Sequence, residues 1–506
     1  MFKATAFISG EAISSGLEEK ELYSVLDGEC IGSIPLLDRE HQKKIFESAY
    51  EGFRKWSQVD YETREKYIFL FGSKLKEHSK QLTQLIQLES GKSEKEAADE
   101  VQRSIDYVTE STHAFHQLMQ KPREFNSEKY PLIPETLQAM YFRVPIGVVL
   151  SITPFNYPLN TVITKIVPAI LMGNSVIQKS STNGSLTGWL VAKIFNDLSL
   201  DGYLITPGAL NYYTGPGADL EKFLQLERVH VDALSYTGSR ENGLSISRAL
   251  PGVPQSLELS ALNVALLLED CELESTCKEL LKGGFAYAGQ RCTSLQLGCA
   301  PIQLKDQFLE ALRKELNDYP YESIPLISKK SVLWIKQAYE DAISKGATLL
   351  TTPIRWEELK DTRVGPIVFY DLSWDMLLAQ EEMFGPILGI LFYKDLEEVI
   401  SQINDLGYGL QASLFSKDLK RAGEIALQID VGRVNVNLAP SRSPDFLPFP
   451  SSRKSGNSEQ GIVNSLYFFS KFRGVVYKSE LVEGEVLDEL NVDEITEGSS
   501  ASEETE

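Results

Sequence analysis

The segment 288–293, AGQRCT, carries the side chain best suited to chemistry, the thiol of Cys292. A cysteine becomes a useful nucleophile when it is partly exposed in an electropositive setting that favours the thiolate, and here Arg291 directly precedes it. The alternative is a small apolar side chain in a core, since free cysteine is among the most buried residue types. A Gly-Gln-Arg run is a poor core sequence, so we expect this segment to approach a cleft.

Two polar residues earlier in the chain could assist such a nucleophile. Glu258 lies between two leucines at the edge of an expected strand, and apolar surroundings suit a carboxylate to general-base work. Asn156 lies in the turn PFNYP after an apolar run, where its amide could donate to an oxygen that gains negative charge. Each has a structural alternative: a strand acid that points to water, and an ordinary turn asparagine.

Further polar residues follow expected strands and could hold a nucleotide. Gly238 and Ser239 could present backbone N–H groups to a phosphate at a helix start, but they complete no Gly-x-Gly-x-x-Gly fingerprint, and turn residues are the alternative. Lys179 and Thr182, with no acid among the next few residues, could meet an adenosine ribose with its 2′-phosphate, which favours NADP and leaves NAD open. Glu382, in the segment EEMFGP, is either a site acid or a solvated one.

The elements that must position these residues alternate between strand and helix from residue 147 onwards. This alternation indicates an α/β fold with two doubly wound parallel-sheet units, one for a cofactor and one for catalysis, plus a β oligomerisation arm. Within it we expect a helix over 273–288 and a strand over 466–478. The expected boundaries are 1–122 and 147–256 for the dinucleotide-binding domain, 257–462 for the catalytic domain, 123–146 and 463–478 for the arm, and 479–506 for a disordered acidic tail.

The composition excludes several classes of partner. The 506-residue chain has a net charge of −21, which argues against nucleic acid or an anionic membrane and means that an anionic substrate needs its own basic pocket. Five cysteines without Cys-x-x-Cys spacing suggest neither a disulfide framework nor a metal site, and the near pair His113 and His116 is expected on a helix surface. Lacking a signal peptide and a long apolar run, the chain is expected to be cytoplasmic.

Taken together, these motifs resemble the aldehyde dehydrogenase superfamily, and within it the non-phosphorylating, NADP-dependent glyceraldehyde-3-phosphate dehydrogenases. The spacing from Asn156 to Glu258 to Cys292, with EEMFGP after it, is highly specific. The likeness includes TPFNYP, GQRCT, YGLQASLF and a Lys-Ser-Gly loop at 454–456. It covers residues 146–182, 235–239, 257–293, 381–386 and 432–461.

The resemblance implies a mechanism. Cys292 would attack an aldehyde to give a thiohemiacetal, and Asn156 with the Cys292 backbone N–H would hold the oxyanion. Hydride transfer to the nicotinamide would leave a thioester, which Glu258 would hydrolyse by activating water. The residues implied for cofactor binding are Thr153, Pro154, Phe155, Lys179, Thr182, Gly238, Ser239, Glu382 and Phe384.

The resemblance also implies a substrate, glyceraldehyde 3-phosphate, oxidised irreversibly to 3-phosphoglycerate without inorganic phosphate by a homodimer or homotetramer. Its phosphate would be gripped by Arg103, Tyr157, Arg291 and Arg442, because the planar fork of arginine makes paired charge-assisted bonds to phosphate. Taken singly, Arg103 could equally be a helix-surface residue, and Arg442 a solvated residue in a Pro/Ser-rich loop.

The sequence departs from the family at two places. Ser260-Ala261-Leu262 replaces the usual Gly-Gly-Lys, so added Cβ atoms could crowd the cofactor and slow turnover. Pro-Ser-Ser at 450–452 stands where a glycine is more usual. Two alternatives therefore stay open: a dehydrogenase of another small aldehyde, such as succinate semialdehyde or lactaldehyde, and a slow or inactive aldehyde dehydrogenase-like binding protein.

Overall fold

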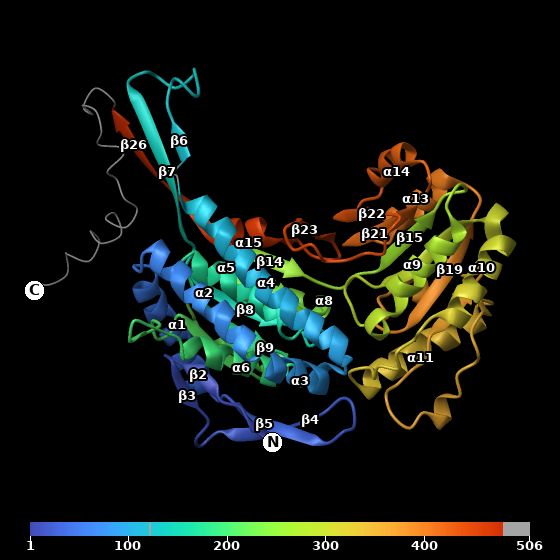
Figure 1. The fold of residues 1–506 in the computed structure, drawn as a ribbon, viewed down its shortest axis with the longest axis horizontal. Helices are drawn as coiled ribbons and strands as arrows, with labels where there is room; N and C mark the ends of the chain where they lie inside the picture. The colour runs from blue at the N-terminus through green and yellow to red at the C-terminus, as the bar shows by residue number, and fades with distance from the viewer. Residues whose placement is uncertain (121–122, 479–506) are drawn as a thin grey trace, which may run out of the picture.

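The computed structural model describes residues 1–120 and 123–478, and the expected acidic tail lies outside these described residues. Figure 1 shows two sheet-based units side by side, with an arm that extends away from them. The predicted α/β class with two parallel-sheet units is confirmed. In the part of the chain that is described, no helix has the length and apolar character needed to cross a membrane.

The first unit is built on a seven-stranded sheet of order β14-β13-β8-β9-β12-β2-β3. The strands from β14 to β12 are parallel, and β2 and β3 extend the edge in antiparallel fashion. Its strands are β2 (Ala6–Ile8), β3 (Glu11–Ile13), β8 (Val148–Thr153), β9 (Ser175–Ser180), β12 (Leu210–Thr214), β13 (Ala233–Thr237) and β14 (Gln255–Glu258). Its helices are α1 (Arg39–Trp56), α2 (Tyr61–Glu77), α3 (Ser79–Ser90), α4 (Glu94–Met119), α5 (Asn160–Leu171), α6 (Ser185–Asn196), α7 (Gly217–Leu226) and α8 (Arg240–Ala249). Small sheets beside it contain β1 (Phe2–Lys3), β4 (Glu18–Tyr23), β5 (Cys30–Leu36), β10 (Ser199–Leu200) and β11 (Tyr203–Leu204).

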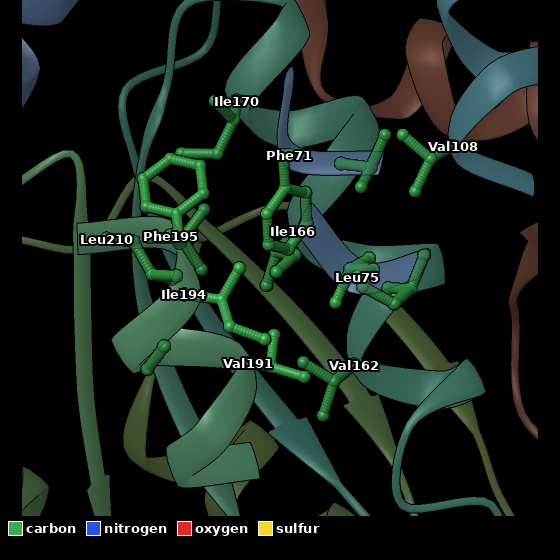
Figure 2. Packing of buried hydrophobic residues seen from close by; sticks show 14 of the residues in the cluster. Phe71, Leu75, Val108, Val162, Ile166, Ile170, Val191, Ile194, Phe195 and Leu210 are labelled. Atoms are coloured by element: carbon green, nitrogen blue, oxygen red, sulfur yellow. The ribbon is translucent and has the colours of Figure 1, made fainter. Parts of the chain in front are cut away.

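Helix α5 is the centre of this unit's core, because all of its residues are buried and nearly all are apolar or small. Figure 2 shows side chains of α2, α5 and α6 meeting there, with the rings of Phe71 and Phe195 5.5 Å apart and edge-on. Each fully buried large apolar side chain contributes about 1.5–3 kcal/mol of transfer free energy. The start of α5, directly after the turn PFNYP, is thereby held rigidly.

The second unit has a seven-stranded sheet of order β17-β18-β19-β16-β15-β21-β22, parallel except for β17. Its strands are β15 (Asn263–Leu267), β16 (Leu295–Pro301), β17 (Thr348–Leu349), β18 (Ile367–Tyr370), β19 (Ile387–Tyr393), β21 (Gln411–Phe415) and β22 (Arg433–Val436). Its helices are α9 (Leu273–Phe285), α10 (Lys305–Asp318), α11 (Lys329–Ser344), α12 (Leu377–Gln380), α13 (Leu396–Asp405) and α14 (Leu419–Ala426), with single 3-10 turns at Ala286–Gly289, Ile302–Leu304 and Trp356–Glu358. Two short antiparallel strand pairs anchor the loop that follows β22. In one, β24 (Ser452–Arg453) pairs with β20 (Tyr408–Gly409), and in the other β23 (Phe449–Pro450) pairs with β25 (Glu459–Gln460).

The arm is a three-stranded antiparallel sheet of order β26-β7-β6, formed by β6 (Arg123–Phe125), β7 (Leu137–Pro145) and β26 (Ser470–Lys478). The strand expected over 466–478 is wrong at its start, because α15 (Ile462–Phe468) occupies those residues. Leu466 turns into the core of the first unit there, which a helix allows and an extended arm strand would not. The remainder pairs with β7 over its whole length.

Candidate active site

A cavity of about 530 Å³ lies at the carboxyl ends of β8, β9, β13 and β14. This is the edge at which open parallel sheets place ligands, because successive strands end there together. The register brings Thr153 opposite Ser180, and Thr237 opposite Glu258. All of the residues that the sequence singled out for catalysis, cofactor binding and substrate binding line this cavity.

The loop that carries Cys292 is strained and tightly tied. The expected helix over 273–288 is wrong at its end: α9 stops at Phe285, because Tyr287 and Ala288 take left-handed φ values of 53° and 47°. Gly289 follows at φ 72°, and a Cβ on it would collide with the carbonyl oxygen of Gly385. The Gln290 side chain links this loop to the segment 325–327, where it accepts from Ile327 N at 2.9 Å and donates to Pro325 O at 3.2 Å.

Cys292 Sγ lies 3.7 Å from Glu258 Oε1. Burial first, and the negative charge of Glu258 second, raise the pKa of the Cys292 thiol far above its usual value, while Arg442 opposes them. The expectation that Arg291 favours the thiolate is wrong. Its guanidinium turns away and donates to Gly283 O at 2.8 Å, so the cation that favours the Cys292 thiolate is Arg442.

Glu258 is held at the last position of β14 by a close-packed loop. The backbone of Gly456 forms a bridge to Glu258 at φ 117°, where a side chain would collide with Leu257 O. Ser455 O accepts from Leu259 N at 2.9 Å. The alternative of a strand acid pointing to water is therefore wrong, since the Glu258 side chain is only 1% exposed.

An arginine occupies the other side of this carboxylate. Arg442 Nη1 lies 3.3 and 3.2 Å from the two carboxylate oxygens of Glu258, and Arg442 Nη2 donates to Gln460 Oε1. Its Nε lies 3.7 Å from Asp445, whose carboxylate also takes a bidentate pair from Arg103, with both N–O distances 2.7 Å. Arg103 and Arg442 are thus part of one charged network, neither a solvated helix residue nor a solvated loop residue.

Tyr157 is supported by a buried ion pair that sequence reasoning missed. Lys92 Nζ lies 3.6 Å from the Tyr157 ring centroid and 2.5 Å from Glu100 Oε2. The other oxygen of Glu100 accepts from the backbone N–H groups of Leu159 and Asn160 at 3.0 Å each. Glu100 therefore fixes the first turn of α5, as an anion at a helix N-terminus does, and with it the turn that contains Tyr157.

Asn156 faces the same loop. Its amide Nδ2 donates to Gln290 O at 3.0 Å, two residues before Cys292. The backbone N–H of Cys292 makes no hydrogen bond within the described residues, 1–120 and 123–478. Asn156 and Cys292 line the same cavity, so these two donors are the candidates for stabilising an oxyanion formed on an atom bound to the sulfur.

Lys179 lines the cavity near the end of β9 and donates to Gly215 O at 2.6 Å. Burial lowers the pKa of Lys179 to about 8, against the opposing charge of Asp219. Helix α7 also brings Glu221 into the cavity wall with Thr182. The absence of an acid among the residues after Lys179 was therefore a poor guide, because α7 supplies acids from more than 35 positions away.

Glu382 and Ser260 line the cavity in contact with each other. Ala261 N donates to Glu382 Oε1 at 2.9 Å, and burial raises the pKa of Glu382 to about 7 while Ala261 and Ser260 oppose the rise. Phe384 stands edge-on to Phe155 with centroids 6.0 Å apart. Of the three unusual residues at 260–262, only Ser260 lines the cavity, and the other two are buried in apolar clusters.

Two further cations near the site escaped the sequence reasoning. Lys165 is buried beside Glu258 and donates to Ser235 Oγ at 2.9 Å, and burial lowers its pKa to about 7. The three side-chain nitrogens of Arg433 are buried and lack hydrogen-bond partners in the described residues. The described residues contain no group of His, Cys, Asp or Glu fit to hold a metal ion.

A profile described as the aldehyde dehydrogenase family matches residues 13–475. An NADP-dependent glyceraldehyde-3-phosphate dehydrogenase of Pisum sativum is 30% identical over 445 residues, 87% of this chain and 88% of that protein. A lactaldehyde dehydrogenase of Methanocaldococcus jannaschii is 28% identical over 480 residues, 93% of this chain and 99% of that protein. The NADP complex of NADP-dependent glyceraldehyde-3-phosphate dehydrogenase from Bacillus halodurans C-125 superposes with a TM-score of 0.88 at 30% identity, over 94% of this chain and all of the other.

Proposed function

The chain belongs to the aldehyde dehydrogenase family, and on this premise we propose that it oxidises glyceraldehyde 3-phosphate to 3-phosphoglycerate with NADP and without inorganic phosphate. One observation carries the substrate: Arg103, Arg291, Arg442 and Tyr157 line the same cavity as the Cys292 thiol. Because Arg291 Nη2 donates to Gly283 O, Arg103 and Arg442 are the guanidinium groups best placed to bind the phosphate of a phosphorylated aldehyde.

The proposed chemistry begins at Cys292. The thiol loses its proton to solvent, with the charge of Arg442 favouring the thiolate, and its sulfur adds to the aldehyde carbon. The Asn156 amide and the Cys292 N–H stabilise the resulting oxyanion. After oxidation, Glu258 takes a proton from water, whose oxygen attacks the thioester carbon, and the C–S bond breaks to release the acid.

The cavity residues fit the dinucleotide. Lys179 is a buried cation suited to an adenosine 2′-phosphate, and Glu382 is a half-buried carboxylate suited to a ribose. Ser239 is the N-cap of α8 and Gly238 precedes it, at a helix start where a pyrophosphate is favoured. NADP, when bound, supplies the hydride acceptor. The NADP dependence of the plant and bacterial relatives supports this cofactor.

The assay that tests the proposal combines the purified protein with NADP and glyceraldehyde 3-phosphate in phosphate-free buffer. Reduced cofactor should appear at a steady rate, with 3-phosphoglycerate as the product. A panel containing lactaldehyde, succinate semialdehyde and unphosphorylated glyceraldehyde runs beside it. A higher kcat/KM for any of these would reassign the substrate.

One observation favours the runner-up, an unphosphorylated small aldehyde such as lactaldehyde. Arg103 and Arg442 already pair with Asp445 and Glu258, so part of the pocket's positive charge is compensated within the protein. The lactaldehyde dehydrogenase relative points the same way. The comparison of phosphorylated and unphosphorylated aldehydes distinguishes the two.

Arg103→Met should lower kcat/KM for glyceraldehyde 3-phosphate by about 10- to 100-fold, the scale of one or two charge-assisted hydrogen bonds. Arg103 contacts neither Cys292 nor Glu258, so the loss for unphosphorylated glyceraldehyde should be much smaller. Steady-state kinetics with both aldehydes measure the ratio. Lys95→Met, on an exposed position of the same helix, is the matched control. Equal losses for the two aldehydes would contradict a role of Arg103 in binding the phosphate.

The affinity for NADP should fall as the pH rises from 7 to 9. Lys179 has a lowered pKa of about 8, so it is cationic below that pH and neutral above it, and only the cation attracts a 2′-phosphate. The dissociation constant for NAD should change little over the same range. Fluorescence titration of both cofactors at several pH values measures this difference, and Lys179→Met should abolish it. A pH-independent NADP affinity would remove Lys179 from the 2′-phosphate site.

We also propose that the chain is a cytoplasmic homodimer or homotetramer. The support for oligomerisation is the arm, whose outer strand β26 has β7 as its strand partner within residues 1–120 and 123–478, with Phe472 and Val476 exposed. Outer strands of this length are normally covered in proteins. Size-exclusion chromatography with light scattering measures the assembly.

A further inference from the structure

Arg442 faces the proposed phosphate pocket and at the same time holds the proposed base. A single nitrogen, Nη1, approaches both carboxylate oxygens of Glu258, at 3.3 and 3.2 Å. Oε1 is also the oxygen nearest to Cys292 Sγ, and Oε2 accepts from Thr237 Oγ1 at 3.2 Å. A carboxylate oxygen of Glu258 that already accepts hydrogen bonds from Arg442, Cys292 or Thr237 is less able to accept a proton from water.

The contact is well buried but not optimal. The Arg442 side chain is 12% exposed and that of Glu258 is 1% exposed, so the pair is little screened by solvent. Yet Arg442 offers Glu258 one nitrogen, whereas the neighbouring pair of Arg103 and Asp445 is bidentate. A phosphate-class oxyanion can accept from two guanidinium nitrogens in parallel, which is the stronger geometry.

We propose that such an oxyanion, which is either the phosphoryl group of the substrate or a free ion, draws Arg442 away from Glu258 and so releases the base for thioester hydrolysis. The inference rests on the proposed function and adds a regulatory step to it. Once Arg442 binds the anion, Glu258 accepts the water proton while the water oxygen bonds to the acyl carbon. The C–S bond then breaks, and the Cys292 thiolate regains a proton from Glu258.

The consequence is selectivity at the acyl-release step. An unphosphorylated aldehyde can be oxidised to a thioester, but hydrolysis of that thioester is slow while Arg442 contacts the base Glu258. A phosphorylated aldehyde brings its own activator. A free oxyanion should therefore substitute for the missing phosphoryl group, which a pocket that only binds substrate would not allow.

The test separates acyl release from oxidation by using p-nitrophenyl acetate, a small ester that acylates a reactive thiol without cofactor. Release of nitrophenolate should show a burst of about one equivalent, followed by a slow phase limited by hydrolysis of the acetyl-enzyme. Sodium phosphite should accelerate the slow phase about tenfold with saturation, the scale of one charge-assisted hydrogen bond, and leave the burst amplitude unchanged. Sodium chloride at equal ionic strength should not.

Arg442→Met supplies the second arm. With the guanidinium gone, the slow phase should already be fast without phosphite, and phosphite should have no further effect. Arg103→Met keeps the contact between Arg442 and Glu258, so phosphite should still accelerate the slow phase, but only at higher concentration. Circular dichroism and the burst amplitude report whether each variant is folded.

Each result decides the question. A slow phase that phosphite leaves unchanged in the wild-type protein overturns the proposal, whatever the variants do, and so does an Arg442→Met protein that responds to phosphite like the wild type. An absent burst would remove Cys292 as the nucleophile and this proposal with it. Because the probe is not an aldehyde, failure here leaves the oxidation of glyceraldehyde 3-phosphate to be decided by its own assay.

Discussion

Cys292→Ser should reduce aldehyde oxidation by at least about 10³-fold, the scale seen when an enzyme loses its nucleophile. A serine hydroxyl fits the space of the thiol, but it is a far weaker nucleophile when its only nearby base is a carboxylate. NADP binding and the thermal unfolding midpoint should stay close to those of the wild type, because within residues 1–120 and 123–478 the sulfur's one hydrogen bond is the 3.7 Å contact with Glu258. Steady-state absorbance of reduced cofactor, cofactor titration and calorimetry measure the three quantities.

Cys30→Ser is the matched control, since Cys30 is another partly buried cysteine and does not line the cavity. It should keep full activity. A Cys292→Ser protein that oxidises aldehydes at a rate near that of the wild type would show that the segment 288–293 is only structural.

Glu258→Gln should stop turnover after a single oxidation. Glutamine keeps the size of the side chain and can still contact Thr237, but it cannot accept a proton from water. We expect a burst of at most one equivalent of reduced cofactor, then a steady rate lowered about 10²- to 10⁴-fold, as is usual for loss of a general base. Rapid-mixing absorbance separates the two phases, and mass spectrometry of the quenched protein should show the acyl group on the chain.

Two measurements exclude loss of stability and a general effect of removing a carboxylate as explanations of this result. Removal of one partner from a buried ion pair can cost about 3–5 kcal/mol, so the unfolding temperature of Glu258→Gln must be measured, although Arg442 keeps its contacts with Asp445 and Gln460. Glu382→Gln changes a second, half-buried carboxylate in the cavity and should raise the KM for NADP without a burst. A burst in Glu382→Gln rather than in Glu258→Gln would reverse the two assignments.

The framework of this site was predictable because it depends on local pattern. Apolar runs such as 148–153 end at polar residues, and parallel strands end at one edge, so Asn156, Lys179 and Glu258 were expected at the same edge of the sheet, where they line one cavity. The Gly-Gln-Arg run, a poor core sequence, also indicated that Cys292 lies at a cleft. These inferences needed only the periodicity of strands and helices and the geometry of an open sheet.

What escaped prediction depends on contacts between side chains far apart in the chain. No local pattern shows that Arg442 turns to Glu258, that Asp445 joins it to Arg103, or that Arg291 turns to backbone carbonyls. The left-handed pair at 287–288 was also hidden, because tyrosine and alanine rarely take that conformation. The acids of α7 reach Lys179 only through the fold.

The departure from the family at 260–262 is smaller in three dimensions than in sequence. Ala261 and Leu262 turn into apolar clusters, and the Ala261 N–H orients Glu382. Only the hydroxymethyl group of Ser260 reaches the cavity. Crowding of the cofactor is therefore limited to one small polar side chain, which bears on the rate of turnover and not on the presence of the site.

The strained turn before Cys292 has a consequence for engineering this protein. Tyr287 and Ala288 each hold a backbone conformation that costs about 1–3 kcal/mol, and Tyr287 is kept there by its hydroxyl, which donates to Ser90 O at 2.8 Å. A library screened only for heat resistance would favour glycine at 288, where relief of strain raises the melting temperature. The same change would make the position of the Cys292 thiol less well defined and so lower the turnover rate. Selection for thermal stability and selection for activity would therefore favour different residues at position 288.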